Sequence, residues 1–284
     1  MQDSPPFPRP GSSLYHALRT VPPGRRPTAA LWLQWWHEVS QIPYTVSDPG
    51  VAESKLRWWL AEIQRAAEQK AEHPLMQRIQ AQAHASPESW PQWSLWTQQL
   101  QGLIQLTQQT RWLDDASLQR HARETTGAAT ESIACLLGAG TEAARTAACQ
   151  LGVGLRQAHQ LARLGQDARA GWVNVAIDVL QTHDVRAHQL SKPDPHQAPP
   201  GWTGLVNHLH GQARASIEQG LNDLRALPPD QQRALRPLLV LAHLHLALID
   251  TIAASGDLVL HQRVMLTPLR KGWITQKVQW GWLN

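Results

Sequence analysis

The sequence predicts a single all-α domain. Nearly every apolar pattern in its 284 residues repeats at helical spacing, and no segment alternates apolar and polar residues as a half-buried strand does. Apolar residues make up 42% and charged residues 17%, a composition typical of a globular chain rather than a disordered one or a coiled coil. We find no internal repeat and no domain boundary. We therefore expect one helical domain over residues 12–284, preceded by a flexible, proline-rich segment over residues 1–11.

The first helices carry start signals. Thr28 can cap a helix whose apolar stripe consists of Leu31, Trp32, Trp35, Trp36 and Val39. Asp48 followed by Pro49 predicts a second start, with a capping carboxylate before a proline in the first turn. We expect this second helix to run to about residue 67, with Glu53 and Arg57 one turn apart on its surface.

The remaining elements follow from helical periodicity and from breaker residues. Four prolines and a glycine predict one long loop over Ser191–Trp202. The most apolar stretch, Leu238–Ile252, is interrupted by two histidines and an aspartate, which favours a buried helix over a membrane span. The further helices are expected over residues 93–110, 117–137, 141–164, 173–182, about 22 residues around the stripe from Leu205 to Leu224, and 237–254.

Charge and composition limit the kinds of partner. The net charge is +4 and the basic residues are scattered, so the sequence lacks the arm typical of nucleic-acid binding. A basic surface facing anionic lipid, and hence a peripheral membrane contact, stays open, although a solvated face is favoured. Residues 1–10 hold no apolar run of the signal-peptide kind. Cys135 and Cys149 lie in apolar, helix-like surroundings and are expected to be buried free thiols, so we predict a cytoplasmic protein.

The histidines and tryptophans have structural interpretations. The pairs His208/His210 and His243/His245 are two residues apart, and such residues point to different faces of a helix, so neither pair can ligate one ion. The chain has 14 tryptophans against one Phe and two Tyr, and we expect most of them to fill core positions. No Gly-rich phosphate loop, Ser/His/Asp arrangement or CxxC pattern is present.

Two strings of residues match a known pattern. One reads Val-Ser-Asp-Pro-Gly-Val-Ala from Val46 to Ala52 and continues through Lys-Leu to Trp58-Trp59. The other runs from His261 to Val264 and continues over residues 266–271. With shorter matches at residues 12–15, 22–26, 151–154 and 165–168, they make the chain resemble the squalene/phytoene synthase family, over about residues 12–278. Within that family it is most similar to the bacterial presqualene diphosphate synthases.

The resemblance implies the isoprenoid synthase fold, a helical bundle around a central cavity. Members of the family join two prenyl diphosphates head to head, and Mg²⁺ bridges the diphosphates to aspartates on two facing helices. Mg²⁺ prefers near-octahedral oxygen ligands. Aspartates one or two helical turns apart can supply such ligands from one face of a helix.

This chain departs from the family at those aspartates. The first motif, Asp-Asp-x-x-Asp, is replaced by Ser40, Gln41, Ile42, Pro43 and Tyr44. His37 stands where the family often has a phosphate-contacting arginine, and Pro43 is expected to kink or end the helix. The second motif, Asp-x-x-x-Asp, reads from Arg163 to Asp167, so only Asp167 matches. No displaced copy of either motif is found elsewhere.

The positions that remain define a former active-site face. On the first helix it comprises His37, Ser40, Gln41 and Tyr44. On the second, Arg156, His159, Arg163 and Asp167 fall at i, i+3, i+7 and i+11, which is one face of one helix. Arg163 and Asp167 are most simply interpreted as a pair that neutralises itself. The alternatives are a metal-free basic pocket for an anionic headgroup, and a cavity filled by tryptophan.

Three functions follow from this comparison. The missing carboxylates favour a catalytically inactive member of the family that needs no cofactor and acts through protein interaction or through binding an isoprenoid or lipid ligand. The resemblance offers a precedent in a degenerate mitochondrial branch that acts in respiratory complex I assembly. The second is an active, Mg²⁺-dependent prenyltransferase of farnesyl-diphosphate farnesyltransferase type, for which Asp167, Glu38 and Glu131 are the carboxylates to offer. The third is a scaffold for an intact synthase.

Overall fold

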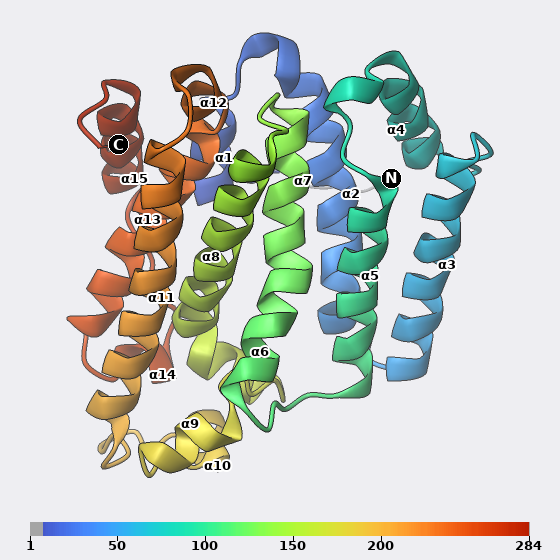
Figure 1. Cartoon of the computed structure of the whole chain (residues 1–284). Coiled ribbons are helices and arrows are strands. Elements are labelled where there is room, and N and C mark those ends of the chain that lie inside the picture. The colour runs from blue at the N-terminus through green and yellow to red at the C-terminus, as the bar shows by residue number, and fades with distance from the viewer. Residues whose placement is uncertain (1–7, 284) are drawn as a thin grey trace.

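A computed structural model describes residues 8–283 as a bundle of helices (Figure 1). Residues 1–7 of the predicted flexible segment lie outside the described part. Among residues 8–283 there is no strand, and one isolated bridge joins Arg111 to Val173. In chain order the helices are α1 (Ser13–Leu18), η1 (Pro23–Arg25), α2 (Arg26–Thr45), α3 (Pro49–Ala67), α4 (Pro74–Ala85), η2 (Pro87–Ser89), α5 (Trp93–Gln108), α6 (Asp115–Ala122), the π-helical turn η3 (Arg123–Gly127), α7 (Ala128–Leu136), α8 (Glu142–Arg169), α9 (Ile177–Thr182), α10 (Ala187–Ser191), α11 (Trp202–Arg225), α12 (Pro229–Ala234), α13 (Arg236–Ala253), α14 (Leu258–His261) and α15 (Pro268–Gln279). The predicted all-α class is confirmed.

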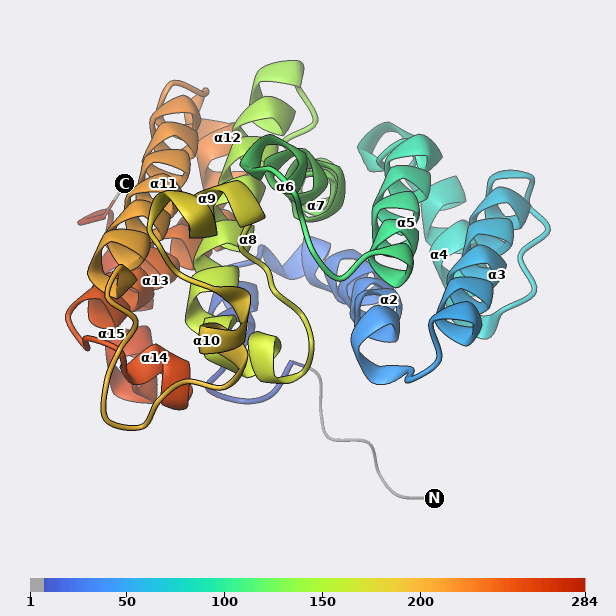
Figure 2. The same ribbon diagram turned by 90° about the horizontal axis from the view of Figure 1, so that it is seen from below.

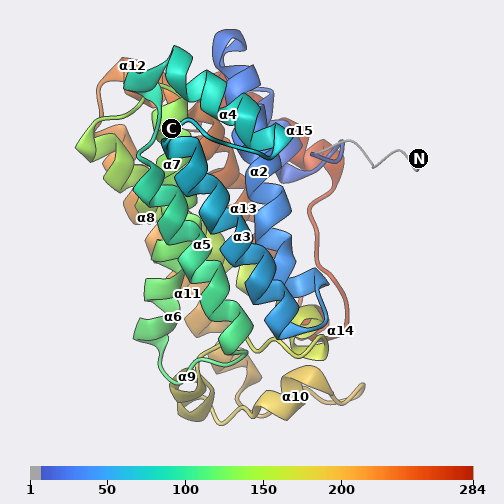
Figure 3. The same cartoon turned by 90° about the vertical axis from the view of Figure 1, so that its right-hand side faces the viewer.

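Seen from below, α2–α5 form one side of the bundle and α11–α15 the other, with α8 between them (Figure 2). The short helices α9 and α10 lie at the lower end, while α4 crosses the upper end (Figure 3). The predicted start of α3 is confirmed, because the Asp48 carboxylate accepts a hydrogen bond of 2.9 Å from the Val51 amide. The predicted pair on its surface is also present, with Arg57 Nη2 at 2.6 Å from Glu53 Oε1.

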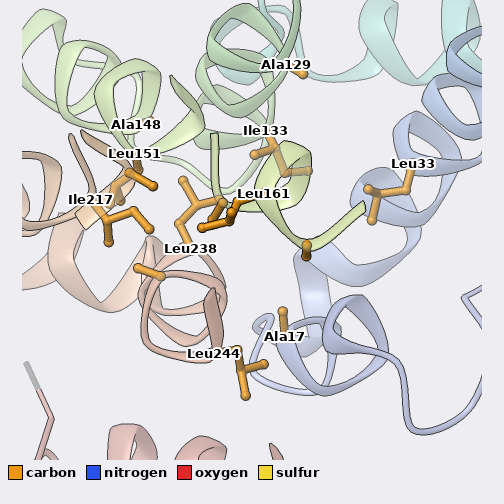
Figure 4. Close-up of a cluster of buried hydrophobic side chains, with 14 of the residues drawn as sticks. Ala17, Leu33, Ala129, Ile133, Ala148, Leu151, Leu161, Ile217, Leu238 and Leu244 are labelled. Atoms are coloured by element: carbon orange, nitrogen blue, oxygen red, sulfur yellow. The ribbon is translucent and has the colours of Figure 1, made fainter. Parts of the chain in front are cut away.

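Helix α8 is the centre of the core and contacts α7, α10, α11, α13 and α14. Leu151 and Leu161 from α8 pack with Ile217 of α11 and Leu238 of α13 (Figure 4). Glycine allows the closest approaches: a Cβ on Gly154 would lie 2.8 Å from the backbone nitrogen of Ile217. The Leu-Gly-Val-Gly string at residues 151–154 therefore serves helix packing.

Several sequence predictions of boundaries were wrong for local reasons. Helix α2 begins at Arg26 rather than after a Thr28 cap, since Pro27 fits the first turn without an amide donor. The single helix expected over residues 117–137 is divided by η3. Helix α9 begins only at Ile177, because the residues before it run extended beside the 111–113 segment, where the Ile177 amide donates to the Trp112 carbonyl at 2.9 Å. Helix α8 continues five residues past Leu164, through Gly165.

Other predictions were confirmed or refined. Helix α2 ends at Thr45, within two residues of Pro43, as the proline predicted. Helices α5, α11 and α13 match their expected ranges to within three residues. Cys135 is buried, but Cys149 is only half-buried. By length and composition one helix in the described chain, α13, could cross a membrane, yet it packs against α8, α11, α1 and α15 as a core helix does.

The tryptophans differ widely in burial. Six of them are buried, which confirms the core interpretation for that group: Trp32, Trp35, Trp59, Trp96, Trp112 and Trp202. Trp35 and Trp96 hold α2 against α5, with ring centroids 4.3 Å apart. Three near the C-terminus behave differently, being half or more exposed: Trp273, Trp280 and Trp282. Their exposure is unusual for so large an apolar side chain.

Candidate functional site

The two halves of the predicted face meet across α2 and α8. Arg156 on α8 donates a hydrogen bond of 3.0 Å from Nη2 to the Tyr44 hydroxyl on α2. The Tyr44 ring also packs edge-on against Trp172, with centroids 5.1 Å apart. Because residues 37, 40, 41 and 44 lie within two helical turns, this contact sets which side of α2 is turned toward α8. His37 and Gln41 are exposed on that helix, and the Ser40 hydroxyl is directed at the His37 carbonyl of its own helix.

The last aspartate of the second motif is already bound by protein donors. Arg163 approaches Asp167 Oδ1 with both Nε and Nη2 at 2.9 Å. Asn174 donates to the other carboxylate oxygen, Oδ2, at 3.1 Å. Asp167 is 7% exposed, so these contacts hold it in the interior. The predicted pairing of Arg163 with Asp167 is confirmed, and the carboxylate has no oxygen left without a protein partner.

His159 lies among basic side chains from several helices. Its side chain is exposed to solvent. Burial is nevertheless the main reason that the pKa of His159 lies well below its usual value. The exposure and the lowered pKa agree if many protein atoms lie around the His159 side chain while part of it still reaches solvent. Positive charge lowers this pKa further, and it comes from Arg156, Arg163, His245 and Arg263. We refer to His159 and the basic side chains around it as the basic recess.

The recess draws basic groups from three separate parts of the chain. Arg156, His159 and Arg163 come from α8, His245 from α13, and Arg263 and Lys271 from the segment that includes α15. Burial and then the charge of Lys271 lower the pKa of His245, while the hydrogen bond between its Nδ1 and the Leu241 carbonyl acts against them. Burial and Arg263 lower the pKa of the Lys271 ammonium, which donates to the Gly11 carbonyl at 3.1 Å. Burial is the main cause of each of these shifts, and a neighbouring basic group adds to it.

The recess is poorly suited to Mg²⁺, the ion that the family resemblance of the sequence implies. Within residues 8–283 no group of three histidine, cysteine or acidic side chains could hold a metal ion. Asp167 is engaged by Arg163 and Asn174, and Glu131 lies 3.7 Å from Arg145 in an ion pair. Glu38 accepts a hydrogen bond from Gln34 along α2. Since Mg²⁺ requires several oxygen ligands in near-octahedral geometry, these residues do not fit it.

Comparison with known proteins accounts for the fold. The family model for squalene/phytoene synthase matches residues 7–270. The chain belongs to the squalene/phytoene synthase family. A phytoene synthase from Thermus thermophilus is 28% identical over 158 residues, an alignment that covers 54% of this chain and about half, 53%, of that relative.

Three solved structures share most of the architecture of this chain. A dehydrosqualene synthase in complex with ligand superposes with a TM-score of 0.76 at 14% identity, covering 95% of this chain and 91% of that one. YisP from Bacillus subtilis subsp. subtilis strain 168 gives 0.66 at 18% identity, covering 93% and 89%. The squalene synthase HpnC from Alicyclobacillus acidocaldarius gives 0.65 at 13% identity, covering 84% and 98%. At these identities the likeness establishes the isoprenoid synthase-like fold.

Sequence reasoning missed part of the recess of this squalene/phytoene synthase family member. From the sequence, His245 is only half of a His-x-His pair, and Arg263 and Lys271 are only members of the C-terminal string. The structure brings His245 and Arg263 toward His159, and Lys271 toward His245. The signal was present, because Arg263 and Lys271 belong to the C-terminal string that carries the family resemblance. The sequence alone does not show that this string lies close to α8 in the folded chain.

Proposed function

We propose that the protein binds the phosphate or diphosphate end of an isoprenoid or lipid-like ligand in the basic recess, without a metal ion, and does not catalyse metal-dependent prenyl transfer. One observation carries the proposal: the described chain shows no metal-ligand set, while the charges of Arg156 and Arg163 on α8 and of Arg263 from the C-terminal segment all act on His159. In this chain the charge that holds the anion would come from guanidinium groups. Arginine pairs with phosphate in two-pronged, charge-assisted hydrogen bonds.

At least one hydrogen-bond donor of the basic recess has no protein partner within the described chain. Arg156 uses Nη2 on Tyr44, whereas its Nε is buried and has no hydrogen-bond partner within the described chain. A buried donor without a partner carries a desolvation cost that an anionic oxygen would relieve. His159 is neutral at pH 7, since its pKa is lowered, and a bound anion would raise that pKa. Ligand binding is therefore expected to take up a proton as the pH falls.

Apolar side chains beside the charged groups favour an amphiphilic ligand over a free anion. On α13, Leu241 and Leu248 lie one turn before and after His245, so the three share a helix face. Both leucines are only partly buried. Half-buried leucines next to basic groups suit a hydrocarbon chain that carries a phosphate head.

The first experiment incubates the purified protein with farnesyl diphosphate, with Mg²⁺ or with EDTA, and follows diphosphate release, C30 products and the thermal unfolding midpoint. We expect no turnover and a rise in the midpoint that persists in EDTA. Arg163→Glu should abolish the rise, and Arg78→Glu on the exposed surface of α4 is the matched control. Both variants add the same charge change, so only the one in the recess should affect binding.

Two other outcomes would replace the proposal. Mg²⁺-dependent turnover that is lost in Asp167→Ala would establish a head-to-head prenyltransferase, the alternative that family membership and the retained Asp167 support. If the protein shows no turnover and no midpoint shift, the result would favour a scaffold that acts through a protein such as an intact synthase or an assembly complex. Co-purification would then be the experiment to pursue.

A further inference from the structure

A second feature lies on the outside of the bundle, away from the basic recess. Leu269, Trp273, Lys277 and Trp280 follow one another at i, i+4, i+8 and i+11 and so form one stripe along α15. The opposite side of the helix packs inward through Ile274, Thr275 and Val278. We call the outer stripe, together with Trp282 in the turn that follows, the tryptophan face. It lies at the upper end of the bundle beside the C-terminus (Figure 1).

The tryptophan face holds four large apolar side chains that the described chain leaves half or more exposed: Leu269, Trp273, Trp280 and Trp282. Leu269 is 87% exposed and Trp282 is 64% exposed. The three indoles contact one another, with ring centroids 5.8 Å apart for Trp273 and Trp280 and 4.8 Å apart for Trp280 and Trp282. A soluble protein rarely exposes a patch of this kind without a partner for it.

The side chains around the tryptophan face are basic, which favours a negatively charged partner. From Leu258 to Asn284 the chain has four basic residues, Arg263, Arg270, Lys271 and Lys277, and no aspartate or glutamate. Lys277 Nζ lies 5.4 Å from the centroid of the Trp273 ring, so it keeps a positive charge directly over the aromatic surface. Beside Trp280, a groove between α15 and the α11–α13 region is lined by three arginines, Arg225, Arg233 and Arg236, and by no acidic side chain of the described residues.

We infer that the tryptophan face and the arginine groove beside it dock the protein on a membrane that contains anionic lipid. Indole rings favour the boundary between headgroups and acyl chains, because one part of the ring is apolar and the N–H can hydrogen-bond. Basic side chains next to an inserted apolar face add attraction to anionic headgroups. A second copy of this chain would bring the same positive charge to the contact, so charge complementarity favours the lipid surface.

This inference does not rest on the function proposed for the recess. The two features nevertheless share a helix, since Lys271 on the inner side of α15 contributes to the recess while Leu269 and Trp273 point outward. Docking through α15 would hold the recess next to the lipid phase. Loss of membrane binding and loss of recess binding can be separated, because they are measured with vesicles and with farnesyl diphosphate in solution.

The test is co-sedimentation of the full chain with vesicles of phosphatidylcholine alone, or of two parts phosphatidylcholine to one part phosphatidylglycerol. We expect binding to the anionic vesicles, weakened by high salt. The triple variant Trp273→Ser/Trp280→Ser/Trp282→Ser should lower the partition coefficient about tenfold or more, as should Arg233→Glu/Arg236→Glu. Trp58→Ser, which removes an exposed indole from α3, is the matched control and should bind as the wild type does.

Circular dichroism on each variant separates lost binding from lost folding, and a variant that fails to fold is replaced by the single change Trp282→Ser, in the turn after α15. Three results would overturn the inference: no binding of the wild type to anionic vesicles, equal binding to neutral and anionic vesicles, or unchanged binding of the folded tryptophan variant. Sedimentation velocity tests the alternative that a second copy of this chain binds the tryptophan face. A dimer that the tryptophan variant disrupts, without any vesicle binding, would assign the face to a second copy.

Discussion

Arg163 and Asp167 form an ion pair on one helix, with 2.9 Å between Nη2 and Oδ1, at the point where the family's second motif places its metal-binding carboxylate. Asn174 occupies the other oxygen. A carboxylate held in this way balances one arginine of the recess rather than presenting ligands to a cation. The pair therefore explains the poor fit to Mg²⁺, while the net positive charge around His159 comes from Arg156 and Arg263, which this carboxylate does not balance.

The first prediction concerns Asp167→Asn. Removing the charge frees Arg163 for an incoming phosphate, so the affinity for farnesyl diphosphate in EDTA should rise about fivefold, equivalent to about 1 kcal/mol. The free energy of unfolding should fall by about 1–3 kcal/mol, because a buried hydrogen-bonded pair is broken. Calorimetric titration and urea unfolding measure the two effects. Glu53→Gln, which breaks the exposed pair with Arg57, should leave both nearly unchanged. Weaker binding by the Asp167 variant in EDTA would contradict the idea that Asp167 competes with the ligand for Arg163.

The second prediction concerns the pH dependence of ligand binding. The pKa of His159 lies well below its usual value in the free protein, mainly through burial, and a bound anion should raise it. A group whose pKa rises on binding takes up protons, so the affinity for farnesyl diphosphate should increase as the pH falls toward about 6. Titrations at several pH values in two buffers of different ionisation enthalpy count the protons directly. His159→Gln should reduce that proton uptake, and an unchanged count would exclude His159 from the site.

The third prediction concerns acid stability. Burial, followed by the charge of Arg156, lowers the pKa of His121 to about 3. The folded protein thus keeps His121 neutral, while the unfolded chain protonates it below its ordinary pKa of about 6.5. Unfolding then takes up a proton, and stability falls as the pH drops from about 6.5 toward 3. Between about pH 6.5 and 4.5 this one group should cost about 2–3 kcal/mol.

The variant His121→Leu should flatten the pH dependence in that window, as measured by urea unfolding at successive pH values. The control His84→Ala removes an exposed histidine from α4 and should leave the slope as in the wild type. A wild-type slope in His121→Leu would show that other groups dominate the acid limb.

The fourth prediction concerns glycine in α8. A Cβ on Gly165 would overlap the Leu260 carbonyl oxygen and lie 2.7 Å from the carbonyl carbon, and backbone atoms of α14 cannot move aside as a flexible side chain can. Gly165→Ala should therefore lower the free energy of unfolding by about 2–3 kcal/mol. Gly211→Ala, on α11 with open space around the added methyl, should raise it by about 0.5–1 kcal/mol. Equal effects of the two changes in chemical denaturation would refute the close approach of α14 to α8.

The sequence predicted most of the long helices and little of what lies between them. The start of α3 could be predicted because Asp48 and Pro49 act within one turn. The end of α8 could not, because Gly165 continues the helix only where α14 packs against it. The start of α9 depends on the hydrogen bond from Ile177 to Trp112, which lies 65 residues earlier in the chain.

The site shows the same division. The face made by Arg156, His159, Arg163 and Asp167 follows from helical spacing, and so does the Arg163–Asp167 pair. The contact from Arg156 to Tyr44 and the approach of Arg263 toward α8 join residues about a hundred positions apart. Such long-range neighbours depend on how the helices pack, which the spacing within one helix cannot specify.

The most direct test of the basic recess is calorimetric titration of farnesyl diphosphate into the purified protein in EDTA and again in Mg²⁺, for the wild type and for Arg163→Glu. The account predicts binding of the wild type that is at least as tight in EDTA as in Mg²⁺, and its loss in Arg163→Glu while Arg78→Glu binds normally. Binding that requires Mg²⁺ and that disappears in Asp167→Ala would contradict it.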